Sequence, residues 1–396
     1  MKKIIFLLIV GFILLGGAVM ILLMSKPFGE KSTPGPKPIS QPTSTLGIYE
    51  VCSDVTDCNL EIGIGKIKEA GAKTVIVTVV DEDGLKSVAY YPSKYLPMTE
   101  DVSSDYLKRI VALSHQNNIK VYASINIPHN HWLANHPDWI AVLSNGMAAD
   151  TYENDYFHRI VPPSRLIAEE ECRELLKNII GEVASYGVDG IDINDNFQFS
   201  DEYLEETDTT LYLSFDDFTI EKFESDKNIT IQGNNPKERA DYIKNHSDIY
   251  LSWLRWRADE IIRLIKMLSQ DIVDTGINIP LRPHLLTFGD PYEYYGLDYE
   301  GIAKEVDVLY LMITPDTDKE KYFEVIKRCK DTKKRVAVST YFFKEEDWDV
   351  VESDKEKLLE RIKWIKDAGA DEIYIYDFGL IEEGNLWSTV KSVSEN

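Results

Sequence analysis

Two acids and two amides end the apolar stretch Gly187–Phe199, GVDGIDINDNFQF. Side chains alternate along a strand, so the two isoleucines share one face while Asp192 and Asn194 share the other, and Asp195 and Asn196 follow directly. Carboxyl groups are rarely buried without a partner or a task, so this pattern indicates acid–base chemistry at the carboxyl end of a strand. The alternative is a strand-end turn, in which Asp and Asn are favoured for their local hydrogen bonds.

Eight apolar strands alternate with amphipathic helices beyond residue 46, which predicts a (β/α)8 TIM barrel. The expected strands are 47–51, 74–80, 120–127, 188–194, 277–286, 306–314, 335–342 and 372–378. The expected helices include 62–70, 106–117, 169–186, 250–274, 319–330 and 356–368. A doubly wound open sheet is the alternative, but the first strand is not followed by a GxGxxG phrase.

Two connections are unusually long. They are residues 128–168 after the third strand and residues 196–249 after the fourth, both beyond the usual length of structureless loops. The chemistry of TIM barrels lies on the loops that follow the strands. Long loops on that side predict a walled groove suited to an extended polymer.

The amino-terminal segment predicts an uncleaved signal anchor over residues 1–25. Residues 4–24 carry no charge over the length that a spanning helix needs, and no A-x-A cleavage site follows. A cleaved signal peptide is the alternative. Residues 26–45 are rich in Pro, Ser and Thr and predict a flexible linker, which leaves 46–396 for the barrel. The short amino-terminal tail and the acidic domain, with sequons at Asn228 and Asn245, favour a single-pass cell-membrane protein whose barrel faces outside.

The amino-acid composition indicates which binding partners, metals and cofactors to expect. The chain carries 43 basic and 67 acidic residues, a net charge of −24, which would repel phosphate backbones, so nucleic acid is not expected as a partner. Cys52 and Cys58 are close enough in sequence to form one bridge in an oxidising compartment, whereas Cys172 and Cys329 lie among apolar residues and predict core thiols. Several histidines crowd the loop after the third strand, but their spacing is a weak metal signal, so neither a metal nor a cofactor is expected.

Five phrases occur in one order along the chain: AYYPSKYLP at 89–97, INIP at 125–128, HPDWIAVLSNG at 136–146, VASYGVDGIDINDNF at 183–197 and WLRWRADEIIRLI at 253–265. Together they resemble the glycoside-hydrolase-like barrels described as family-10-like lipoproteins, and more distantly the hydrolase half of bacterial poly-N-acetylglucosamine deacetylases. The resemblance covers nearly the whole chain after the linker. It implies a TIM barrel that acts on, or binds, a surface polysaccharide.

This sequence departs from those barrels at the fourth strand. The resemblance implies two adjacent acids there, but the first of them is Asn194 in this chain. Val80 and Met312 likewise stand where an Arg and a Gln are implied, whereas Asn126 and Trp256 match. These departures favour the rival prediction, a polysaccharide-binding surface module that has lost catalysis. A metal-dependent polysaccharide deacetylase is a further alternative.

Glycoside hydrolysis needs two carboxyl groups on either side of the scissile bond, about 5 to 9.5 Å apart. Asp192 and Asp195 would lie about 10 Å apart along one strand, with side chains on opposite faces. We therefore expect Asp195 to act as the general acid, with either Asp192 or Asp377 as the base or nucleophile. The residues expected to bind the polysaccharide are polar and aromatic side chains near the strand ends: Glu50, Asp81, Asn126, His129, His131, Asn194, Asn196, Arg282, Tyr310, Tyr341 and Tyr376.

Overall fold

The computed structural model describes residues 44–52, 58–100, 102–149, 159–199, 202–204, 209–211, 213–287, 289–313, 317–341 and 354–395. The expected anchor and almost all of the expected linker lie outside these residues. Within the described part of the chain, no helix combines the length and apolar character needed to cross a membrane.

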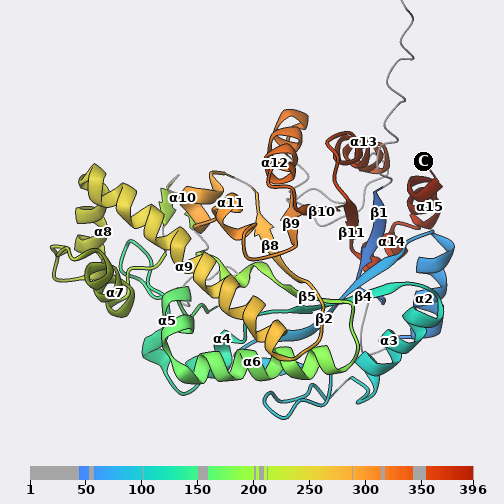
Figure 1. The fold of residues 1–396 in the computed structure, drawn as a ribbon, viewed down its shortest axis with the longest axis horizontal. Coiled ribbons are helices and arrows are strands. Elements are labelled where there is room, and N and C mark those ends of the chain that lie inside the picture. Colours follow the sequence, from blue (N-terminus) through green and yellow to red (C-terminus); the bar gives the residue numbers. More distant parts are fainter. Residues whose placement is uncertain are drawn as a thin grey trace, which may run out of the picture. The chain divides into compact units, whose positions relative to one another are not determined.

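A closed barrel of eight parallel strands forms the centre of the domain (Figure 1). The strands are β1 (Thr45–Tyr49), β2 (Thr74–Asp83), β4 (Lys120–Ile125), β5 (Gly190–Ile193), β8 (Leu281–Leu286), β9 (Val308–Met312), β10 (Arg335–Tyr341) and β11 (Glu372–Tyr376). The sheet closes because β1 pairs in parallel with both β2 and β11. The predicted TIM barrel is confirmed, and each expected strand contains or overlaps an observed one. A short strand, β3 (Lys86–Ala89), extends β2 as an antiparallel hairpin.

Helices surround the strands, as Figure 1 shows. The longer ones are α2 (Leu60–Glu69), α3 (Tyr106–Gln116), α6 (Glu170–Ser185), α9 (Ser247–Asp274), α12 (Lys319–Asp331) and α13 (Asp354–Asp367), with α11 (Tyr299–Ile302) and α15 (Trp387–Glu395) completing the outer layer. Gly71 after α2 and Gly369 after α13 have φ of 80° and 88°, the left-handed conformation with which glycine ends a helix.

The two long connections are folded segments. The first contains α4 (His129–Leu133), η1 (Pro137–Trp139) and α5 (Pro163–Ala168). The second contains η2 (Asp195–Phe197), β6 (Glu202–Leu204), β7 (Thr209–Leu211), α7 (Asp217–Lys227) and α8 (Pro236–Asn245). The shorter α10 (Pro291–Tyr295) and α14 (Phe378–Glu383) follow β8 and β11. Trp253 and Trp256 of α9 stack on each other and pack against Phe223 of α7, so these side chains support the second segment rather than the barrel wall.

Aromatic rings fill the lower part of the barrel lumen. The buried lumen residues are Tyr49, Ile76, Tyr122, Val308, Tyr310, Ala337 and Tyr374. Two glycines make room for two of these rings, those of Tyr374 and Tyr122. A Cβ atom at Gly47 would lie 2.3 Å from the Tyr374 ring, and one at Gly190 would lie 2.6 Å from the Tyr122 ring. A side chain at either position would displace a ring from the lumen.

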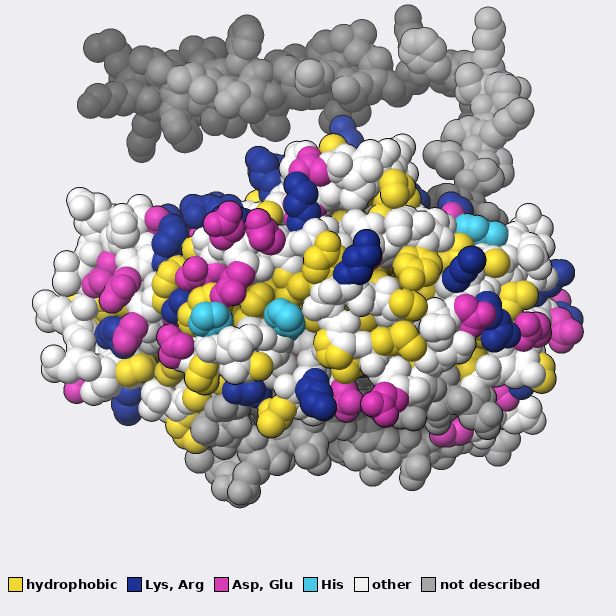
Figure 2. Space-filling model, turned by 90° about the horizontal axis from the view of Figure 1, so that it is seen from below, with side chains coloured by type: hydrophobic (Ala, Val, Ile, Leu, Met, Phe, Trp, Pro, Cys, Tyr) yellow, Lys and Arg dark blue, Asp and Glu magenta, His cyan; other side chains and the backbone are white. Residues whose placement is uncertain are grey.

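Cys52 and Cys58 are joined by a disulfide just after β1, while Cys172 and Cys329 are buried thiols, as expected. On the face that Figure 2 shows, acidic and basic side chains are interspersed, and hydrophobic side chains form a broad band across the middle. Exposed large hydrophobic residues in the described chain include Leu85 at the tip of the β2–β3 hairpin and Leu251 on α9.

Candidate active site

Four carboxyl groups meet at the carboxyl ends of the barrel strands. Glu50 directly follows β1, Asp81 lies near the end of β2, Asp195 begins η2 after β5, and Asp377 follows β11. Because all eight strands are parallel, these ends share one mouth. Burial, and then the charges of these four carboxyl groups, raise the pKa of the Tyr376 phenol, so all four lie around this one side chain.

The Glu50 carboxyl group is held by hydrogen bonds to Thr78. Its Oε1 accepts hydrogen bonds from Thr78 N at 3.0 Å and Thr78 Oγ1 at 2.7 Å. Its Oε2 is buried and has no hydrogen-bond partner among the described residues. Burial raises the pKa of Glu50 to about 7, the charges of Asp377 and Asp81 add to the rise, and the Thr78 hydrogen bonds oppose it. The carboxyl group therefore keeps its proton to near neutral pH.

The backbone at Glu50 is also unusual. Its φ is 66°, in the left-handed region that residues other than glycine rarely occupy. The Glu50 amide donates to Ile76 O at 2.7 Å, which fixes this conformation against β2. Strained backbone of this kind clusters at functional sites, because the surrounding structure must hold it in place.

Asp81 is held by neutral partners. Asn126, which follows β4, donates from Nδ2 to Asp81 Oδ1 at 2.5 Å, and Tyr90 donates to Oδ2 at 3.4 Å. Asn126 is buried and was expected to bind substrate. In the structure it fixes the orientation of Asp81.

Asp377 and Asp195 each begin a helical turn. The Asp377 carboxylate accepts from Leu380 N at 3.0 Å and caps α14, and burial raises its pKa above the ordinary range. Asp195 is half-buried, whereas residues 196–199 after it are all buried. Asn194, also half-buried, accepts from Asp195 N at 3.0 Å and lies 3.2 Å from His284 Nδ1.

Asp192 lies in the floor of the barrel below this mouth. Arg282 Nε donates to Asp192 Oδ1 at 2.6 Å and Arg282 Nη2 donates to Oδ2 at 2.7 Å, while His284 Nε2 lies 3.0 Å from Oδ2. Arg282 Nη1 also donates to Glu372 and to the Tyr374 hydroxyl. Burial opposes ionisation of Asp192, but the Arg282 charge and these hydrogen bonds outweigh it and lower the pKa of Asp192.

Two expectations therefore do not fit the structure. Asp192 cannot reach a substrate as base or nucleophile, because it is fully buried and both carboxylate oxygens are occupied. Arg282 cannot bind substrate either, because it is fully buried and its guanidinium lies 3.5 Å over the Tyr122 ring. The sequence could not reveal this pairing, because the two side chains come from strands 90 residues apart.

Three other expected binding residues have structural contacts instead. His129 is fully buried, where its Nδ1 accepts from Val161 N and its Nε2 donates to Asn196 O. Asn196 bonds to both backbone groups of Ile127. Tyr310 is buried in the lumen with its ring stacked 4.0 Å from His284.

The remaining expected residues lie nearer the mouth. Tyr376 is half-buried beside Tyr49, with 4.9 Å between the ring centroids, and its role in sugar stacking stays a prediction. His131 is half-buried in α4, and burial lowers its pKa. The side chain of Tyr341 lies outside the described residues. Sequence reasoning missed Gln198, although amides at 194, 196 and 198 form a visible alternating pattern.

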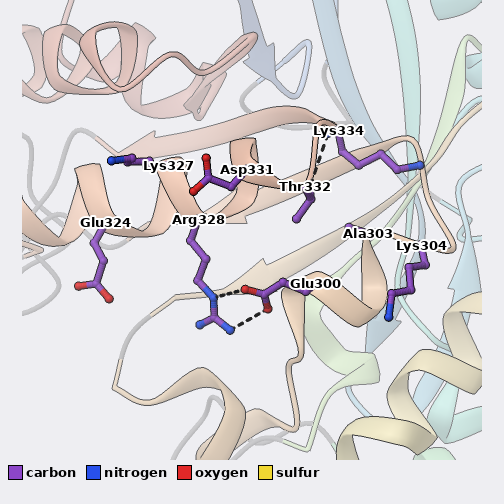
Figure 3. A pocket seen from close by; sticks show the side chains of 9 residues that line it. All are labelled: Glu300, Ala303, Lys304, Glu324, Lys327, Arg328, Asp331, Thr332 and Lys334. Atoms are coloured by element: carbon purple, nitrogen blue, oxygen red, sulfur yellow. Dashed lines mark hydrogen bonds and ion pairs between the residues drawn. The ribbon is translucent and has the colours of Figure 1, made fainter.

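No group of three or more His, Cys, Asp or Glu side chains in the described residues is arranged to hold a metal ion. A hollow on the outer wall, between α11 and α12, is a separate feature (Figure 3). Arg328 and Glu300 form an ion pair across it at 2.7 and 2.8 Å, and Thr332 and Lys334 belong to the turn that precedes β10. This turn lies at the amino ends of the strands, opposite the mouth, so the hollow is not the site of chemistry in a TIM barrel.

Comparisons with known proteins agree with the barrel fold described above. Residues 61–195 match the family model described as hypothetical glycosyl hydrolase 6. No curated protein matches the sequence. The resemblance to glycoside-hydrolase-like barrels is therefore confirmed, and several solved structures share the fold.

The glycoside hydrolase domain of PgaB (BpsB) from Bordetella bronchiseptica is similar, with a TM-score of 0.66 and 13% identity, over 89% of this chain and 99% of that one. The beta-galactosidase of the Antarctic haloarchaeon Halorubrum lacusprofundi has a TM-score of 0.63 and 11% identity, over 89% of this chain and 57% of that one. The beta-galactosidase of Marinomonas ef1 has a TM-score of 0.60 and 12% identity, over 89% and 59%. This chain thus spans a little over half the length of the two beta-galactosidases, and the likeness is one of fold.

Proposed function

We propose that this protein hydrolyses an O-glycosidic bond in a cell-envelope or extracellular polysaccharide, by carboxyl acid–base chemistry without a cofactor. The observation that carries the proposal is the cluster of Glu50, Asp81, Asp195 and Asp377 around Tyr376. One member, Glu50, has its pKa raised to about 7, so the cluster contains a protonated acid beside other carboxyl groups. Glycosidases need this division between a proton donor and an ionised partner.

The roles follow from the surroundings of each group. Glu50 Oε1 already accepts two hydrogen bonds from Thr78, so a proton on this carboxyl belongs on Oε2. We assign the proton donor to Glu50, rather than to Asp195 as the sequence suggested, because burial and the neighbouring carboxyl groups raise the pKa of Glu50 to about 7. Asp195 is then the second carboxyl, acting as base or nucleophile, and Asp377 is the alternative for that role.

The protein is proposed to act outside the cell, held at the membrane by residues 1–25. The disulfide between Cys52 and Cys58 supports an oxidising compartment, because cytosolic thiols are kept reduced. Cys52 lies two residues after Glu50, the proposed acid.

A polysaccharide-binding module without catalysis is the second candidate. It is favoured by Asn194, which stands where related barrels have an acid and which here contacts His284 and the Asp195 amide. In this case the groove would bind a polymer and release nothing.

The test is release of reducing ends from a panel of amino-sugar and neutral polysaccharides by the purified full-length protein. Glu50→Gln and Asp195→Asn are each expected to lose about 100-fold or more of the activity, the usual contribution of one acid or base. Asp83→Asn is the matched control, because Asp83 is exposed at the end of β2. Full activity in both Glu50→Gln and Asp195→Asn would refute the proposed mechanism, and binding without release would favour the second candidate.

A further inference from the structure

The turn that carries Asp195 is attached to β4 on one side. Asn196 accepts from Ile127 N at 2.9 Å and donates to Ile127 O at 3.0 Å. His129 adds a third contact, with Nε2 2.9 Å from Asn196 O. Since Val161 N donates to His129 Nδ1, the proton lies on Nε2, and His129 donates it to Asn196 O. All of these side chains are buried.

The same turn is attached to β8 on the other side. Gln198 is fully buried, and its Nε2 donates to His284 O at 2.8 Å. The same nitrogen donates to Asp195 O at 3.1 Å, and Gln198 Oε1 accepts from Leu286 N at 3.4 Å. Gln198 thus joins the backbone of Asp195 directly to the neighbouring strand.

Aromatic side chains anchor the intervening positions. Phe197 and Phe199 are each 1% exposed, and the Arg257 guanidinium lies 4.8 Å over the Phe199 ring. In the segment 194–199, only Asn194 and Asp195 are half-buried. The anchors therefore bury every side chain of this turn beyond Asp195 and leave Asp195 at the mouth.

Burying the side-chain amides of Asn196 and Gln198 costs desolvation free energy, which a turn with exposed side chains would not require. Each loses its hydration and is stabilised only if its groups find partners of good geometry. Both amides here have such partners, and all of them are backbone groups: Ile127, just after β4, for Asn196, and Asp195, His284 and Leu286 for Gln198. Fully satisfied buried polar networks rigidify the structure around them and specify one conformation.

We propose that Asn196 and Gln198 are positioning residues, which fix the Asp195 carboxyl at the barrel mouth from both neighbouring strands. The catalytic consequence rests on the function proposed above. Neither residue touches the substrate. Their effect is on where the Asp195 carboxyl stands.

The test compares Gln198→Met with Tyr299→Phe in the full-length chain. Methionine keeps the volume of glutamine but removes its donors and acceptor. Tyr299 is the matched control, because its buried hydroxyl donates to Leu286 O at 2.7 Å, in the residue whose N–H Gln198 accepts, while its described hydrogen bonds include none to residues 194–199. Both variants should lower the thermal midpoint similarly. Gln198→Met alone should lower kcat, by about 10- to 100-fold, with little change in KM, because small misplacements of reacting groups have effects of that size.

The second readout does not need activity. The titration of the Asp195 carboxyl, followed by carbon NMR, should shift in Gln198→Met and stay unchanged in Tyr299→Phe. If Gln198→Met matches Tyr299→Phe in both kcat and this titration, the inference is overturned. If the wild-type protein hydrolyses nothing, the proposed function fails, and the titration alone decides whether Gln198 positions Asp195. Should Gln198→Met not fold, Asn196→Leu removes both hydrogen bonds to Ile127 without adding a charge beside Asp195 and is read in the same way.

Discussion

The floor and the mouth of the barrel bury carboxyl groups in opposite ways. In the floor, Asp192 and Glu372 share the guanidinium of Arg282, with contacts of 2.6 to 2.8 Å. At the mouth, Glu50 and Asp81 take their described hydrogen bonds from hydroxyls, an amide and backbone N–H groups. Burial by itself raises the pKa of Asp192 in the floor and of Glu50 at the mouth.

The pKa shifts show which effect wins in each region. The pKa of Asp192 is lowered although burial opposes this, because Arg282 and His284 favour the charged form. The pKa of Glu50 is raised to about 7, because burial and neighbouring carboxyls outweigh the Thr78 hydrogen bonds. A buried acid beside a cation, such as Asp192 beside Arg282, stays ionised and forms an ion pair within the barrel. A buried acid without one is available for proton transfer.

The largest expected effect is in the floor. Arg282→Met leaves Asp192 and Glu372 buried without their shared cation and is expected to lower the free energy of unfolding by about 3–5 kcal/mol, measured by urea denaturation. Arg335→Met is the control, since Arg335 also pairs with Glu372, at 3.4 Å, but is 47% exposed. It should lose no more than about 1 kcal/mol. Equal losses in the two variants would remove the distinction between the floor and a surface pair.

At the mouth, ionisation of the buried Glu50 carboxyl is expected to lower the free energy of unfolding as the pH rises. Its pKa lies near 4.5 in an unfolded chain and near 7 in the folded protein, so the folded state binds more protons between these values. Stability must therefore fall as the pH rises through this window. Glu50→Gln removes that dependence. The gain in the free energy of unfolding of Glu50→Gln over the wild type should therefore be larger at pH 8 than at pH 5, by up to about 3 kcal/mol. Parallel stability profiles of the two proteins would show that the pKa of Glu50 is not raised.

Packing in the floor gives a smaller effect. Gly47→Ala would place a Cβ atom 2.3 Å from Thr74 Oγ1 and from the Tyr374 ring, which bonds to Arg282. It should lower the free energy of unfolding by about 1–3 kcal/mol, the usual range for overpacking. Gly65→Ala in α2 is the control, because nothing lies within 4 Å of its added Cβ and alanine favours the helix by up to about 1 kcal/mol. Thermal unfolding of the pair should give changes of opposite sign.

The smallest effect concerns the tuning of Glu50. The 2.7 Å hydrogen bond from the Thr78 hydroxyl lowers the pKa of Glu50. Thr78→Val removes this bond, and with it the lowering, but keeps the backbone N–H donor. The alkaline limb of the kcat/KM profile should move to higher pH, by less than about one unit, because one hydrogen bond contributes about 1 kcal/mol. A shift downward would mean that Glu50 is not the group titrating in that limb.

Several features of this protein follow from its sequence alone. Short apolar runs between helical patterns located all eight barrel strands, because strands of a parallel sheet covered by helices are buried on both faces. The helix ends at Gly71 and Gly369 are also local, since only the backbone φ decides them. The place of the mouth carboxyls after their strands follows from the order of the elements.

Tertiary structure decided what each carboxyl does. Asp192 and Asp195 are three residues apart, yet one is paired in the floor and the other lies half-buried at the mouth. The deciding partners, Arg282, Gln198 and Ile127, come together only when β4, β5 and β8 lie side by side. Sequence pattern reports which side of a strand a residue occupies. The charge state and orientation of that residue depend on partners that closure of the barrel brings to it from distant parts of the chain.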